Sequence, residues 1–524
     1  MSKEQDRSAD GSGTGGTTGQ GKQLSKKQLK KMRRTKIKIG IFSVTALVCL
    51  LLGTSSLIFL ESFFQNIIKQ ELTLSPSSRS YKMWMKTPIP MYLKIRLFNW
   101  TNPAEVQKNP TVKPHFNQMG PYVFREVNYK VHQVWNNGNS TITFQQQRIW
   151  HFEPDLSNGK LTDYVTTINP IASTIVYMVR NKNALFKTLA IKILERLEKL
   201  TVTKTVGQFL FDGYEDPLLD AATQAKLKLI PFDKFGWFYS RNGSENYDGI
   251  FNILTGASNM NELGMLQEWK YKQVSPYFPN TCGPIKGTNG DLWPPLPNNN
   301  TVSVFSPDVC TSLTLKSNGK SEWLGVTGNM YVSDEDMLDN GTRVDSRQCY
   351  CKDVKCQPSG VLNVSSCKFG APAFVSLPHF YLADESYREN ITGMEPNKED
   401  HEFQLVIEPT TGIPVKVRAA LQINFLIEPD ESSSFFKNIP RMYAPMLWFT
   451  QETNLTSQYA DEMKLLLLLP PLGKWISISV MVIGIICIFY SVFIYVRQRR
   501  SDMNENLLPK DRENEEIQPG ATDE

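Results

Sequence analysis

The chain has 524 residues, of which 41% are hydrophobic and 21% are charged. This is the composition of a globular protein, so a wholly disordered chain is excluded. The apolar residues gather in two runs, 39–60 and 475–496, each of 22 residues without Asp, Glu, Lys or Arg. As a helix, each run would be about 33 Å long, enough to cross about 30 Å of hydrocarbon. A soluble cytosolic enzyme is therefore not expected.

The first 38 residues form a basic segment with 11 Lys/Arg and 3 Asp/Glu, and they contain a Gly/Ser/Thr-rich tract at 11–21. This composition predicts a disordered tail held against anionic lipid. The run 39–60 that follows could be the apolar core of a signal peptide. It is too long for one, however, and no A-x-A cleavage site follows it. We therefore expect a retained transmembrane helix.

Each apolar run is flanked by basic residues on the side that faces the nearer end of the chain. The residues concerned are Lys36, Lys38, Arg497, Arg499 and Arg500. The positive-inside rule therefore places both tails, 1–38 and 497–524, in the cytosol. Residues 61–474 would then face outside, and they hold 41 basic and 41 acidic residues. The net charge of the whole chain therefore says nothing about an acidic ligand, and no nucleic-acid partner is expected.

Asparagine-linked glycosylation motifs support this sidedness. Eight N-x-S/T triplets occur, all between the two runs and none in either tail: Asn99, Asn139, Asn242, Asn299, Asn340, Asn363, Asn390 and Asn454. One triplet means little, because Asn is common here, but eight on one side predict passage through the secretory lumen. We therefore expect residues 61–474 to form a glycosylated ectodomain.

Six of the eight cysteines fall within 86 residues of this region: Cys282, Cys310, Cys349, Cys351, Cys356 and Cys367. In an oxidising compartment an even number of cysteines predicts disulfides, here three bridges with 15 arrangements open. The alternative is a metal site, which the missing C-x-x-C pairs and the absence of histidine between His151 and His379 disfavour. Cys49 and Cys487 lie in the middle of the apolar runs and are expected to be ordinary packing residues.

Most of the ectodomain shows a strand pattern. Short runs with β-branched or aromatic residues occur at 122–124, 142–144, 401–407 and 415–425, and Gly, Pro and Asn punctuate them. This pattern favours an antiparallel sheet or barrel over helices stacked on a parallel sheet.

One stretch, about 171–230, departs from the strand pattern. Its apolar residues recur at intervals of three and four, namely Leu185, Leu189, Ile193, Leu194, Leu197 and Leu200. This spacing predicts an amphipathic helix whose other face carries basic side chains. The basic residues are Lys187, Lys192, Arg196 and Lys199. Such a helical insert is a candidate ligand platform, although a row of charges on a helix is often only its solvated face.

No catalytic or cofactor signature is found. The sequence has no G-x-S-x-G, H-E-x-x-H or P-loop, and its five histidines are scattered without triad or metal-ligand spacing. We therefore expect no enzyme activity, no metal and no cofactor. In the C-terminal tail, Leu507 and Leu508 are similar to an acidic dileucine sorting signal, but Met503 stands where an acid is expected. An incidental leucine pair is the alternative.

Several segments closely resemble the class B scavenger receptor family, which includes the platelet fatty-acid and thrombospondin receptor, the high-density-lipoprotein receptor and the lysosomal integral membrane receptor. The longest of them is GVLNVSSCKFGAPAFVSLPHFYLAD at 360–384. The others are TNPAEVQ, GPYVFRE, DGYEDPLL, GTNGDLWPP and IEPTTGIPV, which begin at residues 101, 120, 212, 287 and 407. They cover nearly the whole ectodomain in the order found in the family.

The resemblance implies an α+β fold: an antiparallel β-barrel ectodomain with an apolar tunnel and an apical helical bundle, anchored by two transmembrane helices. It also implies three disulfide pairs, Cys282 with Cys349, Cys310 with Cys367, and Cys351 with Cys356. Basic residues on the apical helices would receive anionic ligands. The candidates are Lys187, Lys192, Arg196, Lys199 and Lys204.

Two departures limit what the resemblance transfers. The lysosomal member uses an apical histidine to release its cargo at low pH, and no histidine exists here between His151 and His379. The platelet receptor carries acylated tail cysteines, and neither tail of this chain contains a cysteine. A histidine switch in the apical bundle and acylation of the tails are therefore not expected.

Two functions are carried forward. The first is a plasma-membrane receptor that binds lipoproteins, modified lipids or apoptotic-cell surfaces and passes fatty acids, sterols or phospholipids through the tunnel to the membrane. The second is an endosomal or lysosomal sorting receptor whose apical bundle binds a protein cargo. The oligomeric state stays open, a homo-oligomer included.

Overall fold

The computed structural model describes residues 26–507 except 225–232, 280, 297–298 and 352–355. The chain divides into two compact units, residues 1–64 with 468–524, and residues 65–467. The helices α1 (Lys26–Leu72) and α9 (Ser457–Leu507) contribute to both. Each is long and apolar enough to cross a membrane, and each extends beyond the predicted run.

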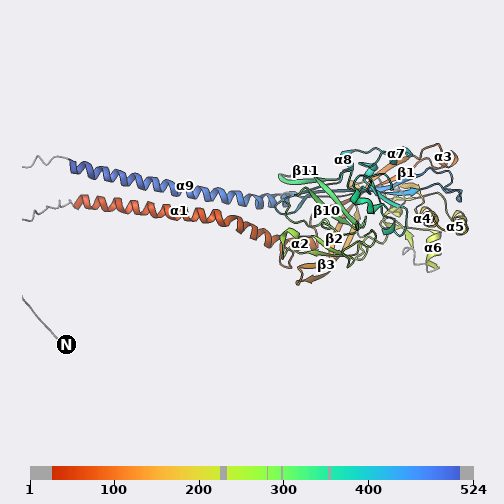
Figure 1. Ribbon diagram of the computed structural model, residues 1–524, viewed down its shortest axis with the longest axis horizontal. Coiled ribbons are helices and arrows are strands. Elements are labelled where there is room, and N and C mark those ends of the chain that lie inside the picture. The colour runs from red at the N-terminus through yellow and green to blue at the C-terminus, as the bar shows by residue number, and fades with distance from the viewer. Residues whose placement is uncertain (1–25, 225–232, 280, 297–298, 352–355, 508–524) are drawn as a thin grey trace, which may run out of the picture. The chain divides into compact units, whose positions relative to one another are not determined.

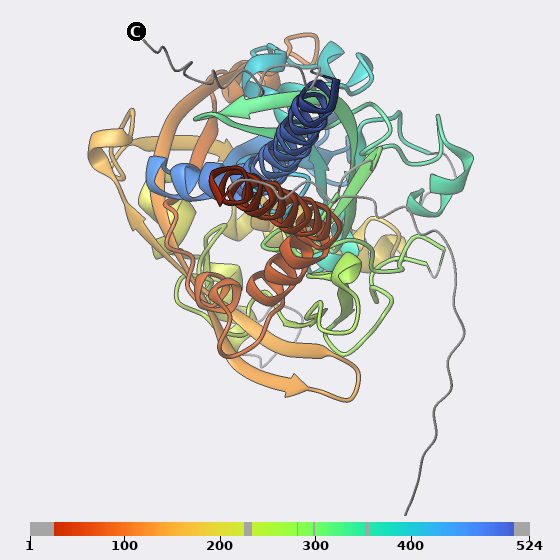
Figure 2. The same ribbon diagram turned by 90° about the vertical axis from the view of Figure 1, so that its left-hand side faces the viewer.

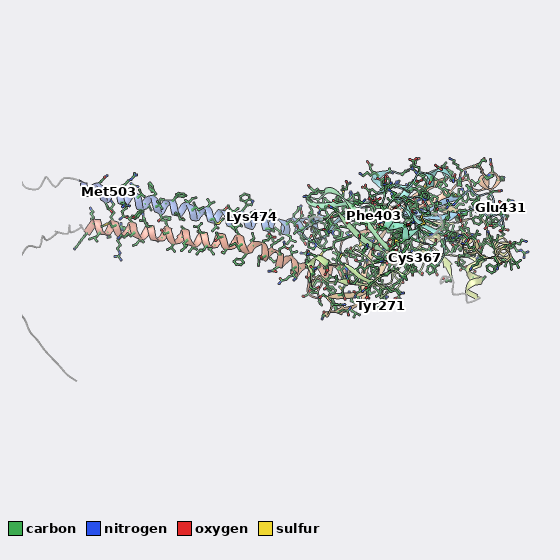
Figure 3. The ribbon with its side chains drawn as sticks, viewed as in Figure 1. Tyr271, Cys367, Phe403, Glu431, Lys474 and Met503 are labelled. Carbon is green, nitrogen blue, oxygen red and sulfur yellow. A yellow bond between two sulfur atoms is a disulfide. The ribbon has the colours of Figure 1, made fainter. Side chains whose placement is uncertain are left out.

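In the first unit, α1 and α9 run side by side in both ribbon views (Figures 1 and 2). Serine pairs join them, with Ser43 Oγ 2.9 Å from Ser491 Oγ and Ser56 Oγ 2.7 Å from Ser477 Oγ. Hydroxyls paired in this way satisfy each other in a hydrocarbon environment. Cys49 and Cys487 are free thiols that lie half-buried in these helices. The apolar part of α9 lies between Lys474 and Met503, which Figure 3 labels.

The second unit is built on one large antiparallel sheet in which eleven strands follow one another in the order β10-β11-β12-β15-β16-β17-β1-β2-β3-β8-β9. In chain order they are β1 (Met91–Trp100), β2 (Phe116–Asn136), β3 (Thr141–Phe152), β8 (Ile250–Leu254), β9 (Leu266–Trp269), β10 (Thr301–Ser306), β11 (Thr311–Trp323), β12 (Val326–Val332), β15 (Gln404–Ile407), β16 (Pro414–Ile427) and β17 (Met442–Asn454). Two short strands, β13 (Val361–Asn363) and β14 (Ala373–Ser376), branch from β16. Two small sheets pair β4 (Tyr164–Ile168) with β5 (Thr201–Thr205), and β6 (Tyr214–Glu215) with β7 (Lys234–Phe235).

One residue, Thr288, nearly closes the sheet into a barrel. It forms bridges to Met265, next to β9, and to Val304 in β10, the two ends of the strand order. Its amide donates to the Ser303 carbonyl at 3.1 Å, and its carbonyl accepts from the Phe305 amide at 2.8 Å. Gly287 beside it has φ +80°, and a Cβ there would lie 1.8 Å from the Ser303 oxygen. Only glycine lets the backbones approach so closely.

Alternation of side chains explains how the strands form the barrel core. In β1, Leu93, Ile95 and Leu97 are buried, and the charged Lys94 and Arg96 stand between them on the other face. A period of two places alternate residues on one face of a sheet. The apolar face of β1 joins a core cluster that also contains residues of β2, β17 and the segment 206–210.

The helices of the second unit are short. They are α2 (Arg79–Met85), α3 (Pro103–Lys108), α4 (Pro170–Val179), α5 (Ala184–Leu197), α6 (Pro217–Gln224), α7 (Ser386–Glu389) and α8 (Lys398–His401). Single turns occur at η1 (Pro154–Leu156), η2 (Gln208–Asp212), η3 (Met260–Glu262), η4 (Asp345–Tyr350), η5 (Ser365–Cys367) and η6 (Pro378–Phe380). Asparagines cap the two helices that matter most below. Asn169 accepts from the Ile171 and Ala172 amides at the start of α4, and Asn183 accepts from the Phe186 amide in α5.

The structure confirms the predicted antiparallel barrel. The expected strands at 122–124, 142–144 and 415–425 lie in β2, β3 and β16. The expected strand at 401–407 is shorter than predicted, because His401 ends α8 and the strand begins at Gln404. The insert at 171–230 is helical but not continuous. Its helices α5 and α6 are separated by β5, and residues 225–230 lie outside the described part of the chain.

Candidate functional site

The second unit contains two adjoining cavities. The first, which we call the α4 cavity because α4 lines it, has a volume of about 190 Å³. The second, the α2 cavity, is lined by α2 among other elements and has a volume of about 260 Å³. Asp308, Leu421 and Phe449 belong to both walls. The two cavities therefore meet at these three side chains inside the barrel.

Aromatic and aliphatic side chains form most of the wall of the α4 cavity. Ile171 comes from α4, Phe235 and Phe238 from the segment around β7, and Val375 and Ile423 from β14 and β16. Aromatic rings of the wall pack on one another, with the Phe235 and Trp237 centroids 5.4 Å apart. Such a wall accepts apolar ligand surface and gives it few hydrogen-bond partners.

The α2 cavity is also mainly apolar. Its wall includes Trp84 of α2, Trp293 of the segment before β10, Phe305 of β10, and Val417 of β16. Leu72, where α1 ends, also lies in this wall. The α2 cavity thus reaches the C-terminal end of α1.

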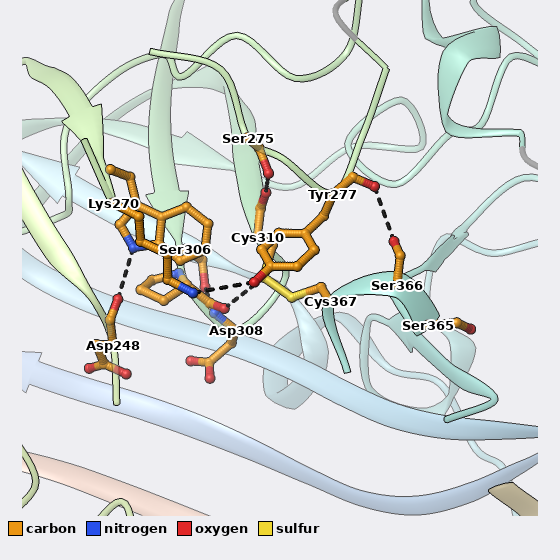
Figure 4. The surroundings of a disulfide bond; sticks show 12 residues. Asp248, Lys270, Ser275, Tyr277, Ser306, Asp308, Cys310, Ser365, Ser366 and Cys367 are labelled. Atoms are coloured by element: carbon orange, nitrogen blue, oxygen red, sulfur yellow. Dashed lines mark hydrogen bonds between the residues drawn. A yellow bond between two sulfur atoms is a disulfide. The ribbon is translucent and has the colours of Figure 1, made fainter. Parts of the chain in front are cut away.

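The disulfide between Cys310 and Cys367 holds part of the α4 cavity wall. On one side of the bridge, Asp308 and Val309 line the cavity, and on the other side Lys368 and Phe369 do so. Around the bridge, Ser275 Oγ donates to the Cys310 carbonyl at 2.7 Å. Figure 4 shows Ser275, Asp308 and the bridge between Cys310 and Cys367. The bridge joins two wall segments that are 57 residues apart in the sequence.

A network of buried charges lies where the cavities meet. Arg241 donates to Asp308 Oδ1 and to Asp248 Oδ1, each at 2.8 Å. Arg148 Nε lies 3.2 Å from Asp248 Oδ2 and 3.7 Å from Glu126 Oε1. Breaking a buried pair of this kind costs about 3–5 kcal/mol, because the remaining charge is left without compensation.

The pKa values in this network follow from burial and pairing. Burial alone would raise the pKa of Asp308, but Arg241, Lys368 and Arg148 together outweigh it and hold that pKa at about 2. For Glu126 burial prevails, and its pKa is raised although Arg148 opposes the shift. Burial lowers the pKa of the Lys368 ammonium, and Asp308 opposes this shift.

The predicted apolar face of α5 is only partly buried. Leu194 is 1% exposed, but Leu185 is 83% exposed, Leu189 58% and Ile193 50%. Phe186 and Leu197 are also exposed, and only Ile191 and Leu194 of the helix are buried. We call the five exposed apolar residues of α5 the α5 ridge: Leu185, Phe186, Leu189, Ile193 and Leu197.

The predicted basic residues do not form one cluster. Lys187 Nζ lies 2.7 Å from Asp430 Oδ2, and its side chain is mostly buried, so it lies on the inner side of α5. Lys192, Arg196 and Lys199 are exposed. Lys204 lies on β5, with its Nζ 4.8 Å from the centre of the Tyr214 ring. The acidic Glu195 accepts from Ser433 Oγ at 3.0 Å. The exposed charges of α5 are therefore basic.

The six ectodomain cysteines form three disulfides: Cys282 with Cys349, Cys310 with Cys367, and Cys351 with Cys356. These are the three pairs that the family resemblance implied. The described residues include no group of three His, Cys, Asp or Glu side chains able to hold a metal ion.

The asparagines of the glycosylation motifs differ in exposure. Asn139, Asn242, Asn299 and Asn390 are exposed, and Asn99 and Asn454 are half-buried. Asn340 is 4% exposed and Asn363 9%. Asn340 Nδ2, the atom that would carry a glycan, donates to the Gln357 carbonyl at 2.9 Å. Of the predicted sorting pair, Leu507 ends α9 and Leu508 lies outside the described residues.

Sequence reasoning missed the charged residues of the cavity walls. Arg241, Asp308 and Lys368 come from distant segments, and no spacing in the sequence connects them. One signal was available for Lys368, because it directly follows a cysteine in the segment 360–384 that carries the family resemblance.

Comparison with known proteins identifies the family. Residues 43–495 match the sequence model of the CD36 family. The protein belongs to the CD36 family. Among its relatives is Protein peste of Drosophila melanogaster, 35% identical over 427 residues, which are 81% of this chain and 77% of the relative.

Two further relatives show the range of this family. Scavenger receptor class B member 1 of Bos taurus is 28% identical over 478 residues, 90% of this chain and 91% of the relative. Lysosome membrane protein 2 of Homo sapiens is 30% identical over 431 residues, 81% of this chain and 88% of the relative. This CD36-family protein is therefore a membrane protein of the class B scavenger receptor type with two membrane-spanning helices, and it is not an enzyme.

Proposed function

We propose that this CD36-family protein is a receptor for lipid-bearing ligands that passes apolar lipid through its barrel to the membrane. The observation that carries the proposal is the pair of adjoining, mainly apolar cavities, which share Leu421 and Phe449. A fatty acid, sterol or phospholipid chain inside such walls stays out of water, so the cost of hydrating it does not arise during passage. The ligands would be lipoproteins, modified lipids or apoptotic-cell surfaces.

The proposal includes a topology in which both tails are cytosolic and the glycosylated barrel faces outside the cell or into the lumen of an organelle. The basic residues beside the two spans and the glycosylation motifs support it. Protease added to intact cells making the protein should remove the barrel and spare the tails. Digestion of the tails with protection of the barrel would contradict this topology.

Passage through the barrel is tested by a plug at the junction of the cavities. Leu421 is 5% exposed and lies in both walls. Leu421→Trp should reduce uptake of labelled lipid by cells while ligand capture at the surface is unchanged. Leu324→Trp is the matched control, because Leu324 is exposed and lines neither cavity. Equal uptake by both variants at equal surface amounts would rule out passage by this route.

Capture of lipid particles is proposed for the α5 ridge together with Lys192, Arg196 and Lys199. A helix with exposed Leu, Ile and Phe beside Lys and Arg suits a lipid surface with anionic head groups. Burying one large apolar side chain contributes about 1.5–3 kcal/mol, which is about tenfold or more in affinity. Leu189→Glu should therefore weaken capture of lipoprotein by cells about tenfold. Leu156→Glu, at an exposed leucine on η1, is the control.

The second candidate is a sorting receptor of endosomes or lysosomes that binds a protein cargo. The same α5 ridge favours it, because exposed apolar helix faces also bind proteins. One relative carries the name Lysosome membrane protein 2. Surface labelling at steady state separates the candidates. A largely intracellular pool that moves to the surface after Leu507→Ala and Leu508→Ala would favour sorting over uptake at the plasma membrane.

A further inference from the structure

A strained hairpin turn directly follows β9. Trp269 and Lys272 pair across it, because the amide of each residue donates to the carbonyl of the other, at 2.9 and 3.1 Å. The two residues between them, Lys270 and Tyr271, have φ +52° and +59°. A two-residue hairpin turn needs this left-handed backbone at both positions, and asparagine and glycine usually supply it. With lysine and tyrosine in their place the turn is strained.

Packing of the Tyr271 ring does not account for the strain. Tyr271 is 69% exposed, and Figure 3 labels it at the edge of the second unit, away from the end that carries α5 in the same view of Figure 1. Lys270 beside it is held in place, with its Nζ 4.4 Å from the centre of the Trp269 ring and 3.3 Å from Tyr277 Oη (Figure 4). Strained residues that no core contact requires are typical of ligand sites.

A second lysine of the turn faces a lysine from another segment. Val274 and Pro284 form an antiparallel bridge, and continuing this register by two residues places Lys272 opposite Lys286. The backbone of Lys286 is fixed, because its amide donates to Ser312 Oγ at 3.0 Å and its carbonyl accepts from the same hydroxyl at 2.8 Å. Like charges opposite each other on two paired segments destabilise the pairing. An anion bound between the two ammonium groups would remove this cost.

No acid neutralises these lysines within the described part of the chain. Lys270, Lys272 and Lys286 are exposed there, and none of the three forms an ion pair with an Asp or Glu side chain that the structure describes. Between residues 263 and 290 the sequence has one acidic residue, Glu268, which is half-buried on β9. We call Lys270, Tyr271, Lys272 and Lys286 the tip patch. It lines neither the α4 nor the α2 cavity.

The side chains of the tip patch suit one class of partner. A protein interface usually has an apolar centre, and a lipid surface takes up several aliphatic or aromatic side chains. The tip patch offers a single ring, that of Tyr271, among three ammonium groups. A sulfated glycan has the matching features, because its sulfates repeat along the chain and its sugar rings present C–H faces that pack on an aromatic ring.

We propose that the tip patch binds a sulfated glycosaminoglycan chain. Lys272 and Lys286 bind one sulfate between them, Lys270 binds a neighbouring sulfate, and a sugar ring packs on Tyr271. This partner differs from the lipid that the barrel is proposed to pass, and the assignment does not rest on that passage. The strained turn serves the site because it places the tyrosine ring between the lysines.

Binding of a heparin dodecasaccharide to the full chain in detergent tests the tip patch. The wild-type protein should bind it, with an affinity that falls as salt is added. Lys272→Gln with Lys286→Gln should weaken binding about tenfold and make the salt dependence shallower, because two ionic contacts are lost. Lys108→Gln with Lys320→Gln is the matched control, since both lysines are exposed on other elements, α3 and β11. Its affinity should equal that of the wild type.

Tyr271→Gly separates the ring from the fold. Glycine adopts a φ of +59° without strain, so the midpoint of urea unfolding should not fall, while heparin binding should weaken about threefold. A lower midpoint with unchanged binding would show that the ring serves the fold, and would overturn its role as a ligand contact.

Each other outcome contradicts a stated part of the proposal. Undiminished heparin binding by the double lysine variant, with the same salt dependence as the wild type, would overturn the site. Loss of binding in Lys192→Gln with Arg196→Gln instead would place the glycan on α5. Equal binding of a desulfated dodecasaccharide would overturn the assignment to sulfate. Tip-patch-dependent binding of polyglutamate or of phosphatidylserine vesicles, without binding of heparin, would assign the patch to an acidic protein or to a lipid surface.

Discussion

Two buried histidines make the stability of the barrel depend on pH. His379 and His401 are 6% and 3% exposed, and their rings stack with centroids 4.5 Å apart. Each ring accepts a backbone hydrogen bond at Nδ1, His379 from the Glu395 amide and His401 from the Asn397 amide, both at 3.0 Å. Protonation at Nδ1 would remove the accepting lone pair and place a hydrogen against each donating amide. Both rings are therefore held neutral in the folded protein.

Burial is the main cause of low pKa values at both rings. It lowers the pKa of His379 to about 3, with further contributions from His401 and Arg96, and that of His401 to about 4, although Asp400 opposes the second shift. In the unfolded chain each pKa is about 6.5. At pH values between the folded and unfolded pKa, the unfolded state binds more protons than the folded state. The two neutral rings therefore contribute their full stability above about pH 6.5, and this contribution is lost as the pH falls. From pH 7 to pH 5 the loss is about 2 kcal/mol for each histidine.

Replacement of one ring isolates this contribution. His401→Phe keeps an aromatic ring against His379 but cannot be protonated. Between pH 7 and pH 5 the two histidines should remove about 4 kcal/mol from the free energy of unfolding of the wild-type protein, and the variant should lose about 2 kcal/mol less. Denaturant unfolding of the full chain in detergent, followed by tryptophan fluorescence at both pH values, measures the difference. His151→Phe, at an exposed histidine, is the control. An equal loss in wild type and His401→Phe would refute the reasoning.

Three further predictions concern packing, charge and modification. Gly287→Ala should destabilise the barrel by about 3 kcal/mol or more, because a Cβ there meets the Ser303 oxygen at 1.8 Å. Gly319→Ala is the control, because Gly319 has a similar φ of +82° but open space around it, and it should cost only the backbone strain of about 1–2 kcal/mol; urea unfolding of both tests this. Arg241→Met should cost about 3–5 kcal/mol, since it removes the hydrogen-bonded partner of Asp308 and leaves Asp248 with Arg148 alone, and a thermal midpoint equal to that of the wild type would contradict the pairing. Glycopeptide mass spectrometry should find Asn340 unmodified and the exposed motifs occupied, and a glycan on Asn340 would mean that this asparagine is not buried as described.

The sequence alone predicts the membrane spans and the barrel because those signals are local. An apolar run of 22 residues and a two-residue alternation such as that of β1 can each be read without knowing any distant contact. The helix α5 shows where this reasoning stops. Its spacing shows that it has two faces, but which face meets the protein is set by Asp430 and the segment beyond it, which pair with Lys187 and Glu195.

The candidate site was harder to predict than the fold. The wall of the α4 cavity combines Ile171, Phe238, Asp308, Lys368 and Leu421, and only the sheet order and one disulfide bring these together. A charge among apolar residues looks the same in a sequence whether it faces solvent or a cavity. For this reason the basic residues of the helical insert were predicted as ligand contacts, and the position of Lys368 in the cavity wall was not predicted.

The link that Thr288 makes between β9 and β10 has a consequence for aggregation of the protein. An open sheet ends in two strands whose amides and carbonyls have no partners, and such borders recruit strands from other chains. Here the Thr288 amide and carbonyl bond to β10, and the Gly287 carbonyl accepts from the Leu266 amide of β9, so part of each border is occupied. Loss of this contact would expose both borders to pairing with a strand of another chain.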